Sequence, residues 1–206
     1  MMRITTGIYK GRLINMPKGI RPTQDKARKA IFDILGDIEG LTFLELFAGS
    51  GAVGIEALSR GAKEAVFVEN KRECLRQIEA NLALLGLALG VVIGLDAQEA
   101  IKKLSQKGRK FEIIFLDPPY YADAATPNPI GWVGVPLSVA KKTLHTLTSY
   151  DILAPDGLVV VQHYKKDALP DTPGDLILFK QSRYGDTALS FYRKNHVPDS
   201  HISRDV

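Results

Sequence analysis

The sequence has 206 residues, 45% of them hydrophobic, so it can bury one sizeable core and is expected to form one domain with short appendages. Its single cysteine, Cys74, excludes a disulfide framework and a multi-cysteine zinc site, and the absence of a long apolar run or a secretory leader predicts a cytoplasmic protein without membrane span or metal. The net charge of +4 is uneven, because the first 29 residues carry eight basic side chains against one acidic side chain, Asp25. This asymmetry suggests a polyanionic partner, and a solvated arm that keeps the protein soluble explains the charge alone equally well.

The first predicted elements are a hairpin and a helix. Ile4 to Ile14, with glycines at positions 7 and 11, fits a small basic hairpin. Asp25 to Leu35 has the period of an amphipathic helix, with Ala27, Ala30, Ile31, Ile34 and Leu35 on one face. We therefore expect a basic extension over residues 1–24, followed by the main domain over residues 25–194.

Short apolar runs then alternate with helical patterns, as in an α/β protein with a largely parallel sheet. Five runs are compact and apolar, as expected of strands covered on both faces: Leu41–Ala48, Ala65–Asn70, Val91–Ala97, Phe111–Asp117 and Gly157–Tyr164. The helices predicted between them are Ala52–Arg60, Lys71–Leu85, Gln98–Lys107 and Leu137–Tyr150.

The end of the domain breaks this alternation. Asp175 to Tyr184 and Thr187 to Lys194 are strand-like runs joined by Gly185-Asp186, a dipeptide typical of a tight hairpin. An antiparallel hairpin that closes a parallel sheet is typical of the methyltransferase variant of the doubly wound fold. The sequence thus predicts a doubly wound, mostly parallel seven-stranded sheet of the class I S-adenosylmethionine-dependent methyltransferase type, with residues 195–206 frayed.

A glycine-rich loop follows the first strand of this sheet and opens a helix. Its glycines permit a sharp turn and close approach of a nucleotide-like ligand to the backbone. Gly49 to Gly54 also spells the G-x-G-x-x-G pattern of dinucleotide enzymes, so a nicotinamide dehydrogenase stays an alternative. Glu45 and Phe47, just before the glycines, favour S-adenosylmethionine, because they match a loop that holds a zwitterionic amino acid rather than a pyrophosphate.

Acidic residues end the next two predicted strands. Glu69 can accept hydrogen bonds from both ribose hydroxyls of either cofactor, and Asp96 can accept one from the adenine amino group. The residues expected at S-adenosylmethionine are Glu45, Phe47, Ala48, Gly49, Ser50, Gly51, Glu69, Asn70, Asp96, Ala97 and Asp117.

The most specific motif is Asp117-Pro118-Pro119-Tyr120, at the carboxyl end of the fourth predicted strand. An exocyclic amine of a base is a poor nucleophile, because its lone pair is delocalised into the ring. The Asp117 carboxylate and the Pro118 carbonyl can each accept one N–H and turn the lone pair toward a methyl donor. Pro119 stiffens the turn, and Tyr120 can stack on the base. The structural alternative is a rigid surface turn after a strand.

With these motifs in place, the sequence resembles the bacterial 16S ribosomal RNA guanine-N2 methyltransferases of the D type, which act on the small ribosomal subunit, over nearly its whole length. The stretches that carry the resemblance are Met2–Arg12, Arg21–Arg28, Leu46–Ala62 and Arg183–Leu189 through Tyr192. The resemblance implies transfer of a methyl group to N2 of a guanine in 16S ribosomal RNA of the small subunit. It also implies RNA contacts by the amino-terminal segment, through Arg3, Lys10, Arg12, Arg21, Thr23 and Arg28.

Two stretches depart from this resemblance. Tyr121 to Pro136 is longer than the corresponding loop, and Gln162-His163 ends the fifth strand where an acidic residue is expected, so no role is transferred to either. The alternatives that remain are a DNA adenine-N6 or other nucleic-acid amino-methyltransferase, and an inactive cofactor-binding ribosome-assembly factor. A monomer is expected.

Overall fold

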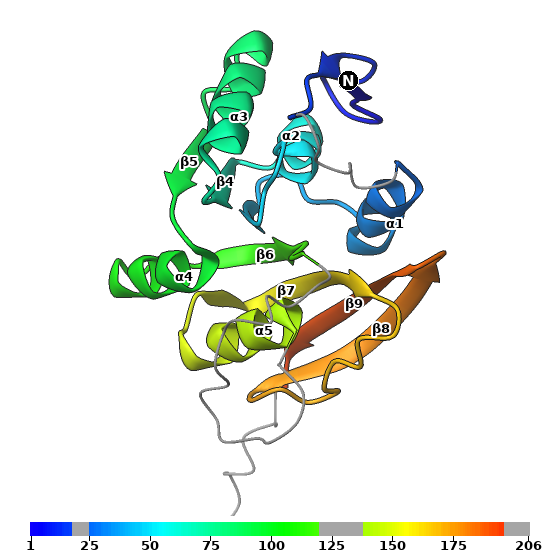
Figure 1. The fold of residues 1–206 in the computed structure, drawn as a ribbon, viewed down its shortest axis with the longest axis vertical. Coiled ribbons are helices and arrows are strands. Elements are labelled where there is room, and N and C mark those ends of the chain that lie inside the picture. The colour runs from blue at the N-terminus through cyan, green and yellow to red at the C-terminus, as the bar shows by residue number, and fades with distance from the viewer. Residues whose placement is uncertain (18–24, 120–137, 196–206) are drawn as a thin grey trace, which may run out of the picture.

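The computed structural model describes residues 1–17, 25–119 and 138–195, which form a three-layer α/β arrangement (Figure 1). The central sheet has seven strands in the order β5-β4-β3-β6-β7-β9-β8. The neighbours from β5 to β7 pair in parallel, and β9 pairs antiparallel with both β7 and β8. The strands are β3 Thr42–Leu46, β4 Glu64–Glu69, β5 Gly90–Gly94, β6 Phe111–Leu116, β7 Leu153–Tyr164, β8 Leu176–Tyr184 and β9 Thr187–Lys194.

In the described part of the chain, five helices cover the two faces of this sheet. They are α1 Asp25–Leu35, α2 Ala52–Ser59, α3 Arg72–Leu85, α4 Ala97–Gln106 and α5 Val139–Ser149. One core joins α1, α2 and α3 to the first face, through residues such as Phe32, Ile55 and Ile78. A second core joins α4 and α5 to the other face, through residues such as Ile101 and Leu144. Side chains alternate along a strand, so Phe43 packs into the first core and Leu44 into the second.

The predicted amino-terminal hairpin is present, with very short strands. β1 Met2–Arg3 pairs antiparallel with β2 Leu13–Ile14. Met2, Ile4 and Ile14 are buried in the core shared with α1, α2 and α3, so the hairpin is packed on the domain. Gly7 is needed at the tip, because a Cβ atom there would lie 1.7 Å from the Ser59 carbonyl oxygen at the end of α2.

The structure confirms the predicted fold, and its largest difference from the predicted elements lies in β7. This strand begins at Leu153, four residues before the predicted start at Gly157. Its pairing with β6 shifts register between Phe111, which faces Leu153, and Ile113, which faces Leu158. The irregularity accommodates the exposed Pro155 and Asp156, because a proline can lie in a strand where the ladder is interrupted. Within the described ranges, no helix is long and apolar enough to cross a membrane.

Candidate active site at the carboxyl ends of the strands

The two principal motifs meet where β3 and β6 lie side by side. Leu46, the last residue of β3, pairs with Leu116, the last residue of β6. The strand that follows β3 in the sequence, β4, lies on one side of this pair, and the strand that follows β6, β7, lies on the other. This is therefore the point where the strand order reverses. In open α/β sheets, ligands bind outside the carboxyl ends of the strands at this point. The Asp117 amide nitrogen lies 3.5 Å from the Leu46 carbonyl oxygen, which places the catalytic motif next to the glycine loop.

The glycine loop makes a tight turn with three residues at positive φ. Phe47 has a φ of 60°, Gly49 one of 56° and Gly51 one of 75°. Such a conformation costs a phenylalanine about 1–3 kcal/mol, so the surrounding structure must hold it in place. Gly51 caps α2, and a Cβ atom there would lie 3.2 Å from the Phe67 ring. The absence of a side chain at Gly51 therefore lets the loop pack closely on the core residues Phe67 and Ile78.

Glu45 lies beneath this loop. Its side chain is buried, and its two carboxylate oxygens accept hydrogen bonds from the Val53 and Gly54 amides, at 3.3 and 2.8 Å. These amides belong to the first turn of α2, where a carboxylate also interacts favourably with the helix dipole. Gly54 permits this contact, since a Cβ atom there would lie 2.9 Å from Glu45 Oε2. Glu45 thus supports the loop from below, and its direct contact with a cofactor stays a prediction.

Burial raises the pKa of Glu45 from 4.5 to about 8, against the lowering effect of the Gly54 and Val53 amides. The charges of Asp117 and Glu69 raise this pKa further, so three carboxylates gather at the ends of β3, β4 and β6. Between pH 4.5 and about 8, Glu45 carries a proton in the folded protein and has lost it in the unfolded chain. Its free energy of unfolding should therefore fall by a few kcal/mol as the pH rises from about 4.5 to 8. Chemical denaturation at pH 5, 6.5 and 8 should show this decline in the wild type and a smaller one in Glu45→Gln.

The matched control for this pH dependence is Glu79→Gln, at an exposed position on α3. It should keep the wild-type slope of unfolding free energy against pH. An unchanged slope in Glu45→Gln would mean that Glu45 does not hold the extra proton.

Glu69, the last residue of β4, binds the backbone around the loop. Its side chain is buried, and it accepts hydrogen bonds from the amides of Gly49 at 2.9 Å, Asn70 at 2.8 Å and Lys71 at 2.9 Å. A carboxylate offers about four acceptor positions, so capacity for a ribose hydroxyl remains. Glu69 thereby joins the glycine loop to the start of α3.

The predicted adenine-side residues lie near the start of α4. Asp96 is exposed and caps this helix, since its Oδ1 accepts a hydrogen bond from the Gln98 amide at 2.9 Å. Ala97 is buried as the first residue of α4, and Asn70 is exposed between β4 and α3. In the loop itself, Ala48 and Ser50 are buried. Asp96 therefore has a structural role as a helix cap, and the ligand contacts of all these residues stay predictions.

The Asp117-Pro118-Pro119-Tyr120 motif is described as far as residue 119. Asp117 is half-buried, Pro118 is buried and Pro119 is exposed. Gln162, at the end of β7, donates a hydrogen bond from Nε2 to Asp117 Oδ2 at 2.7 Å. Tyr120 and the Tyr121 to Pro136 loop lie outside the described residues.

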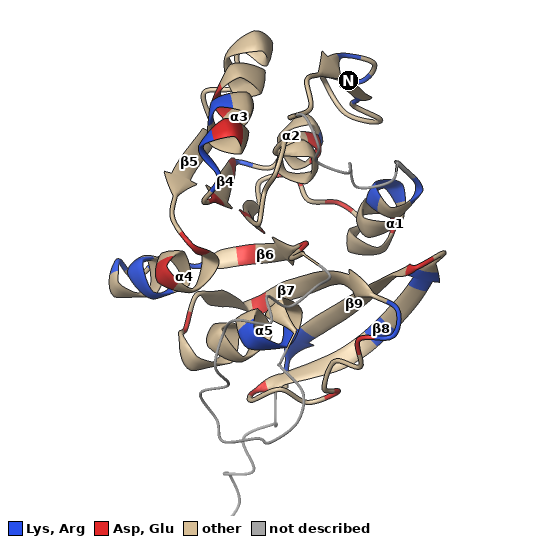
Figure 2. Cartoon of the chain, viewed as in Figure 1, with Lys and Arg blue, Asp and Glu red and all other residues tan. Residues whose placement is uncertain are grey.

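The predicted RNA-binding residues fall into two groups. Arg3, Lys10 and Arg12 are exposed on the amino-terminal hairpin, where Figure 2 colours parts of the ribbon as Lys and Arg. Arg28 is different, and its predicted contact with phosphates needs correction. It is 1% exposed, its Nη2 donates to the Arg3 carbonyl at 2.7 Å, and its Nε lies 3.6 Å from Glu56 Oε2. Arg21 and Thr23 lie outside the described residues.

Arg28 is buried for a reason that its position on the predicted helix did not reveal. The amino-terminal hairpin closes over α1 and places the Arg3 carbonyl and the Met2 sulfur against the guanidinium. The buried carboxylate of Glu56 on α2 compensates its charge, as a buried charge requires. Arg28 therefore joins the hairpin, α1 and α2, and its guanidinium is not available to RNA in this structure.

Sequence reasoning missed two polar residues around the loop. Asn81 is fully buried on α3, and its Nδ2 donates to the carbonyls of Ser50 at 3.2 Å and Asn15 at 3.0 Å. An asparagine beside apolar positions of an amphipathic helix is the pattern that could have revealed it. Gln162 is the second, and no pattern in the strand pointed to its bond with Asp117.

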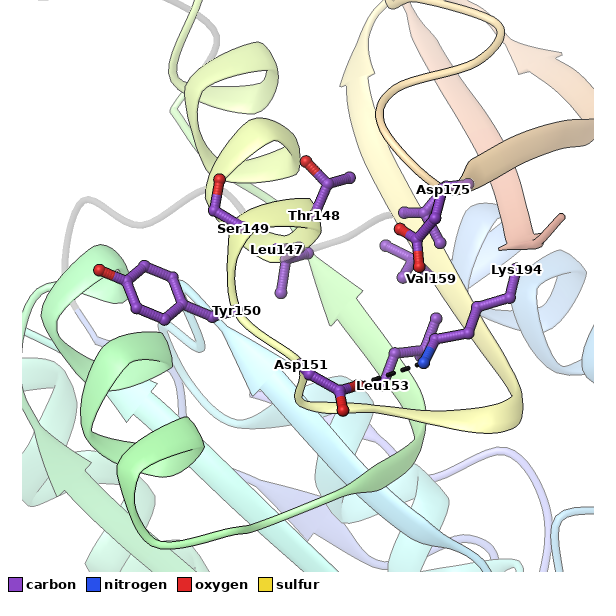
Figure 3. A pocket seen from close by; sticks show the side chains of 10 residues that line it. Leu147, Thr148, Ser149, Tyr150, Asp151, Leu153, Val159, Asp175 and Lys194 are labelled. Carbon is purple, nitrogen blue, oxygen red and sulfur yellow. Dashed lines mark hydrogen bonds and ion pairs between the residues drawn. The ribbon is translucent and has the colours of Figure 1, made fainter.

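A hollow of about 230 Å³ lies at the opposite end of the sheet (Figure 3). It is lined by the end of α5 and the start of β7, and Lys194 pairs across it with Asp151 at 3.2 Å. Because β7 begins there, the hollow faces the amino ends of the parallel strands. Ligands of open α/β sheets bind at the carboxyl ends, so this hollow is separate from the candidate active site.

Comparison with known proteins agrees with this geometry. The chain is 34% identical to the Bacillus subtilis protein YlbH over 197 residues, covering 94% of this chain and 99% of YlbH. It is 31% identical to ribosomal RNA small subunit methyltransferase D of Escherichia coli (strain K12) over 202 residues, covering 97% and 93% of the two chains. The solved structure of Escherichia coli yhhF superposes with a TM-score of 0.77 at 31% identity, covering 94% and 97%.

The family model described as "Conserved hypothetical protein 95" matches residues 2–193, which include the amino-terminal hairpin, the glycine loop, Asp117-Pro118-Pro119-Tyr120 and the terminal hairpin. This match and the relatives confirm the resemblance to the small-subunit methyltransferases of the D type that the motifs indicate. The chain therefore belongs to the Conserved hypothetical protein 95 family and has the class I methyltransferase fold.

Proposed function

We propose that this chain transfers a methyl group from S-adenosylmethionine to N2 of a guanine in the 16S RNA of the small ribosomal subunit. The observation that carries the proposal is the position of Asp117 and Pro118 beside the glycine loop, at the ends of the paired strands β6 and β3. The relative named ribosomal RNA small subunit methyltransferase D matches nearly the whole chain, which supports ribosomal RNA as the substrate.

The loop fits S-adenosylmethionine on structural grounds. Positive φ at Gly49 and Gly51 turns the backbone sharply, and a Cβ atom at Gly51 would crowd Phe67 and Ile78. Glu69 lies beside Gly49, within reach of a ribose held by the loop. The neighbouring carboxylates Glu69 and Asp117, one beside Gly49 and one beside the end of β3, suit a ligand with a sulfonium and an ammonium group better than one with a pyrophosphate, because a pyrophosphate is repelled by them. This repulsion disfavours a nicotinamide dehydrogenase.

When bound, S-adenosylmethionine supplies an electrophilic methyl group. The protein has to orient the amine that attacks it. Asp117 and the Pro118 carbonyl each accept one N–H of the target amine, which leaves the nitrogen lone pair directed at the methyl carbon. Proline at position 118 suits this task, because its ring fixes φ.

A strong general base is not required at this site. Once the nitrogen carries the new methyl group it is positively charged and readily loses a proton. Asp117 therefore orients the amine and stabilises the positive charge that develops on it, and both roles need an acceptor held in one place.

The amino-terminal hairpin is proposed to bind phosphates. Arg3, Lys10 and Arg12 are exposed on it, and the hairpin packs on α2, the helix that follows the glycine loop. Each phosphate that they neutralise releases counterions, so affinity for RNA should fall with salt. Because the hairpin is packed on α2, its bound phosphates would set how far the target nucleotide lies from the active site.

The test is incubation of the purified protein with tritiated S-adenosylmethionine and small ribosomal subunits that lack base methylation. Label should appear in 16S RNA, and mass spectrometry of its digest should identify N2-methylguanosine at one position. Label in adenine would overturn the guanine assignment. The matched control is the same protein with Asp117→Ala, which should bind subunits and transfer no label.

A DNA adenine-N6 methyltransferase would use the same amine chemistry, so double-stranded DNA is included as a second substrate. Label in DNA alone would replace the proposal with this rival. An inactive assembly factor would bind S-adenosylhomocysteine and label neither substrate. A thermal-shift comparison of NAD with S-adenosylhomocysteine separates both methyltransferase hypotheses from a dehydrogenase.

A further inference from the structure

Gln162 contacts the catalytic carboxylate from the neighbouring strand. β6 and β7 pair in parallel with Leu116 opposite Val161, so Asp117 and Gln162 both follow directly at the same edge of the sheet. The Gln162 Nε2 atom donates to Asp117 Oδ2 at 2.7 Å, a short distance that is typical of a hydrogen bond to a charged acceptor. The Gln162 side chain is 5% exposed, so water competes little for this bond.

The other half of the Gln162 amide is not satisfied within the described part of the chain. Its Oε1 is buried, and no hydrogen-bond donor reaches it there. A buried carbonyl without a donor lowers the stability of the folded state, because its desolvation is not compensated. A leucine of similar size would avoid this cost. Stability alone therefore does not explain a glutamine in this position. The hydrogen bond that its side chain makes within the described residues goes to Asp117, on which the proposed mechanism depends.

We infer that Gln162 positions the Asp117 carboxylate for catalysis, an inference that rests on the proposed role of Asp117 in orienting the target amine. The last torsion of an aspartate side chain is broad, so the carboxylate plane is weakly fixed by its own rotamer preference. A donor on Oδ2 fixes that plane. Gln162 thereby sets the direction in which the carboxylate accepts the N–H of the amine.

The next residue of β7 provides a comparison. His163 points to the opposite face of the sheet, as successive residues of a strand do, and is 2% exposed. Its Nε2 lies 2.9 Å from Ser190 Oγ, and its Nδ1 lies 3.0 Å from the Tyr164 carbonyl oxygen. It is equally buried and polar, and its bonds go to β9 and its own strand. His163 therefore serves as a control for the loss of a buried polar group near the site.

The first experiment replaces Gln162 with leucine, which keeps the volume and removes the donor. We expect kcat for methyl transfer to small subunits to fall by about 10- to 100-fold, because a carboxylate without the Gln162 donor holds the amine in the reactive geometry less often. KM for subunits and Kd for S-adenosylhomocysteine should stay within about threefold. The melting temperature should stay close to the wild-type value, since removal of the unsatisfied Oε1 offsets the loss of the hydrogen bond to Asp117. A purely structural glutamine would show the reverse, a lower melting temperature with full kcat.

The second experiment replaces Gln162 with glutamate. The introduced carboxyl can donate to Asp117 Oδ2 only while it is protonated, and two ionised carboxylates at this distance repel each other. Activity relative to the wild type should therefore be highest at low pH, near pH 6, and should fall as the pH rises to 8.5. Repacking alone would not create this pH dependence.

The control is His163→Asn, which should lower the melting temperature and leave kcat within about twofold. The inference is overturned if Gln162→Leu keeps kcat within threefold of the wild type, or if Gln162→Glu has the wild-type pH profile. These outcomes differ from a failure of the proposed function, in which wild-type protein would transfer no label to small subunits and both proposals would fall.

Discussion

Replacing Asp117 with alanine is expected to abolish methyl transfer, with a loss in kcat of at least about a hundredfold. The carboxylate lies beside the glycine loop and is the acceptor that directs the lone pair of the amine, so its removal leaves only the Pro118 carbonyl. The loop, Glu45 and Glu69 are unaffected. Binding of S-adenosylhomocysteine by calorimetry should therefore change by less than tenfold, or about 1.4 kcal/mol.

The matched variant Asp117→Asn keeps the shape and one acceptor oxygen but loses the negative charge. It should retain more activity than Asp117→Ala, because the side-chain amide can still accept one N–H. The control is Asp37→Ala, at an exposed position between α1 and β3, which should have wild-type kcat. An Asp117→Ala protein that methylates at the normal rate would remove the proposed mechanism.

Replacing Glu56 with alanine is expected to lower the free energy of unfolding by about 3–5 kcal/mol. Glu56 is 1% exposed on α2 and accepts hydrogen bonds from the Thr5 amide at 2.9 Å, the Thr5 hydroxyl at 2.7 Å and the Thr6 amide at 2.9 Å. It also pairs with the buried Arg28, at 3.6 Å. Its loss leaves a buried guanidinium without this counter-charge and removes three hydrogen bonds that hold the hairpin. Urea denaturation followed by circular dichroism measures the change.

Two variants separate the effect of the buried charge from that of an ordinary surface charge. Glu99→Ala breaks an exposed pair with Lys103, in which both side chains are 52% exposed, and should cost about 0.5 kcal/mol or less. The double variant Arg28→Met with Glu56→Leu removes both buried charges and should recover part of the stability lost in Glu56→Ala. If Glu56→Ala and Glu99→Ala cost the same, the buried network does not hold the hairpin.

The Glu56 network also relates the two proposed functional elements. Glu56 lies one turn into the helix that the glycine loop opens, and it holds the hairpin that carries Arg3, Lys10 and Arg12. A shift of the hairpin would therefore be transmitted to α2. The hairpin that carries the proposed RNA contacts is therefore hydrogen-bonded to the helix that begins at the glycine loop.

The sequence by itself determined the fold class and the two motifs. Alternation of apolar runs with amphipathic patterns predicted the strands and helices within a few residues, because burial on both faces of the sheet demands continuous apolar strands. Glycines before α2 and Asp-Pro-Pro after β6 are local features, since each owes its form to backbone geometry within a few residues. Each motif follows a strand of one parallel sheet, so both lie at the same edge of it, where ligands of such sheets bind.

Only the tertiary structure decided what the polar side chains do. Arg28 looked like a surface cation on its helix, yet the hairpin and Glu56 bury it. Gln162 stands where an acidic residue is expected and received no role from the sequence, because its bond to Asp117 depends on the register of β6 with β7. Glu45 supports the loop from beneath through its bonds to α2, a position that its place before the glycines did not reveal. Burial and hydrogen-bond partners come from segments far apart in the chain, so periodicity and spacing along the sequence do not contain them.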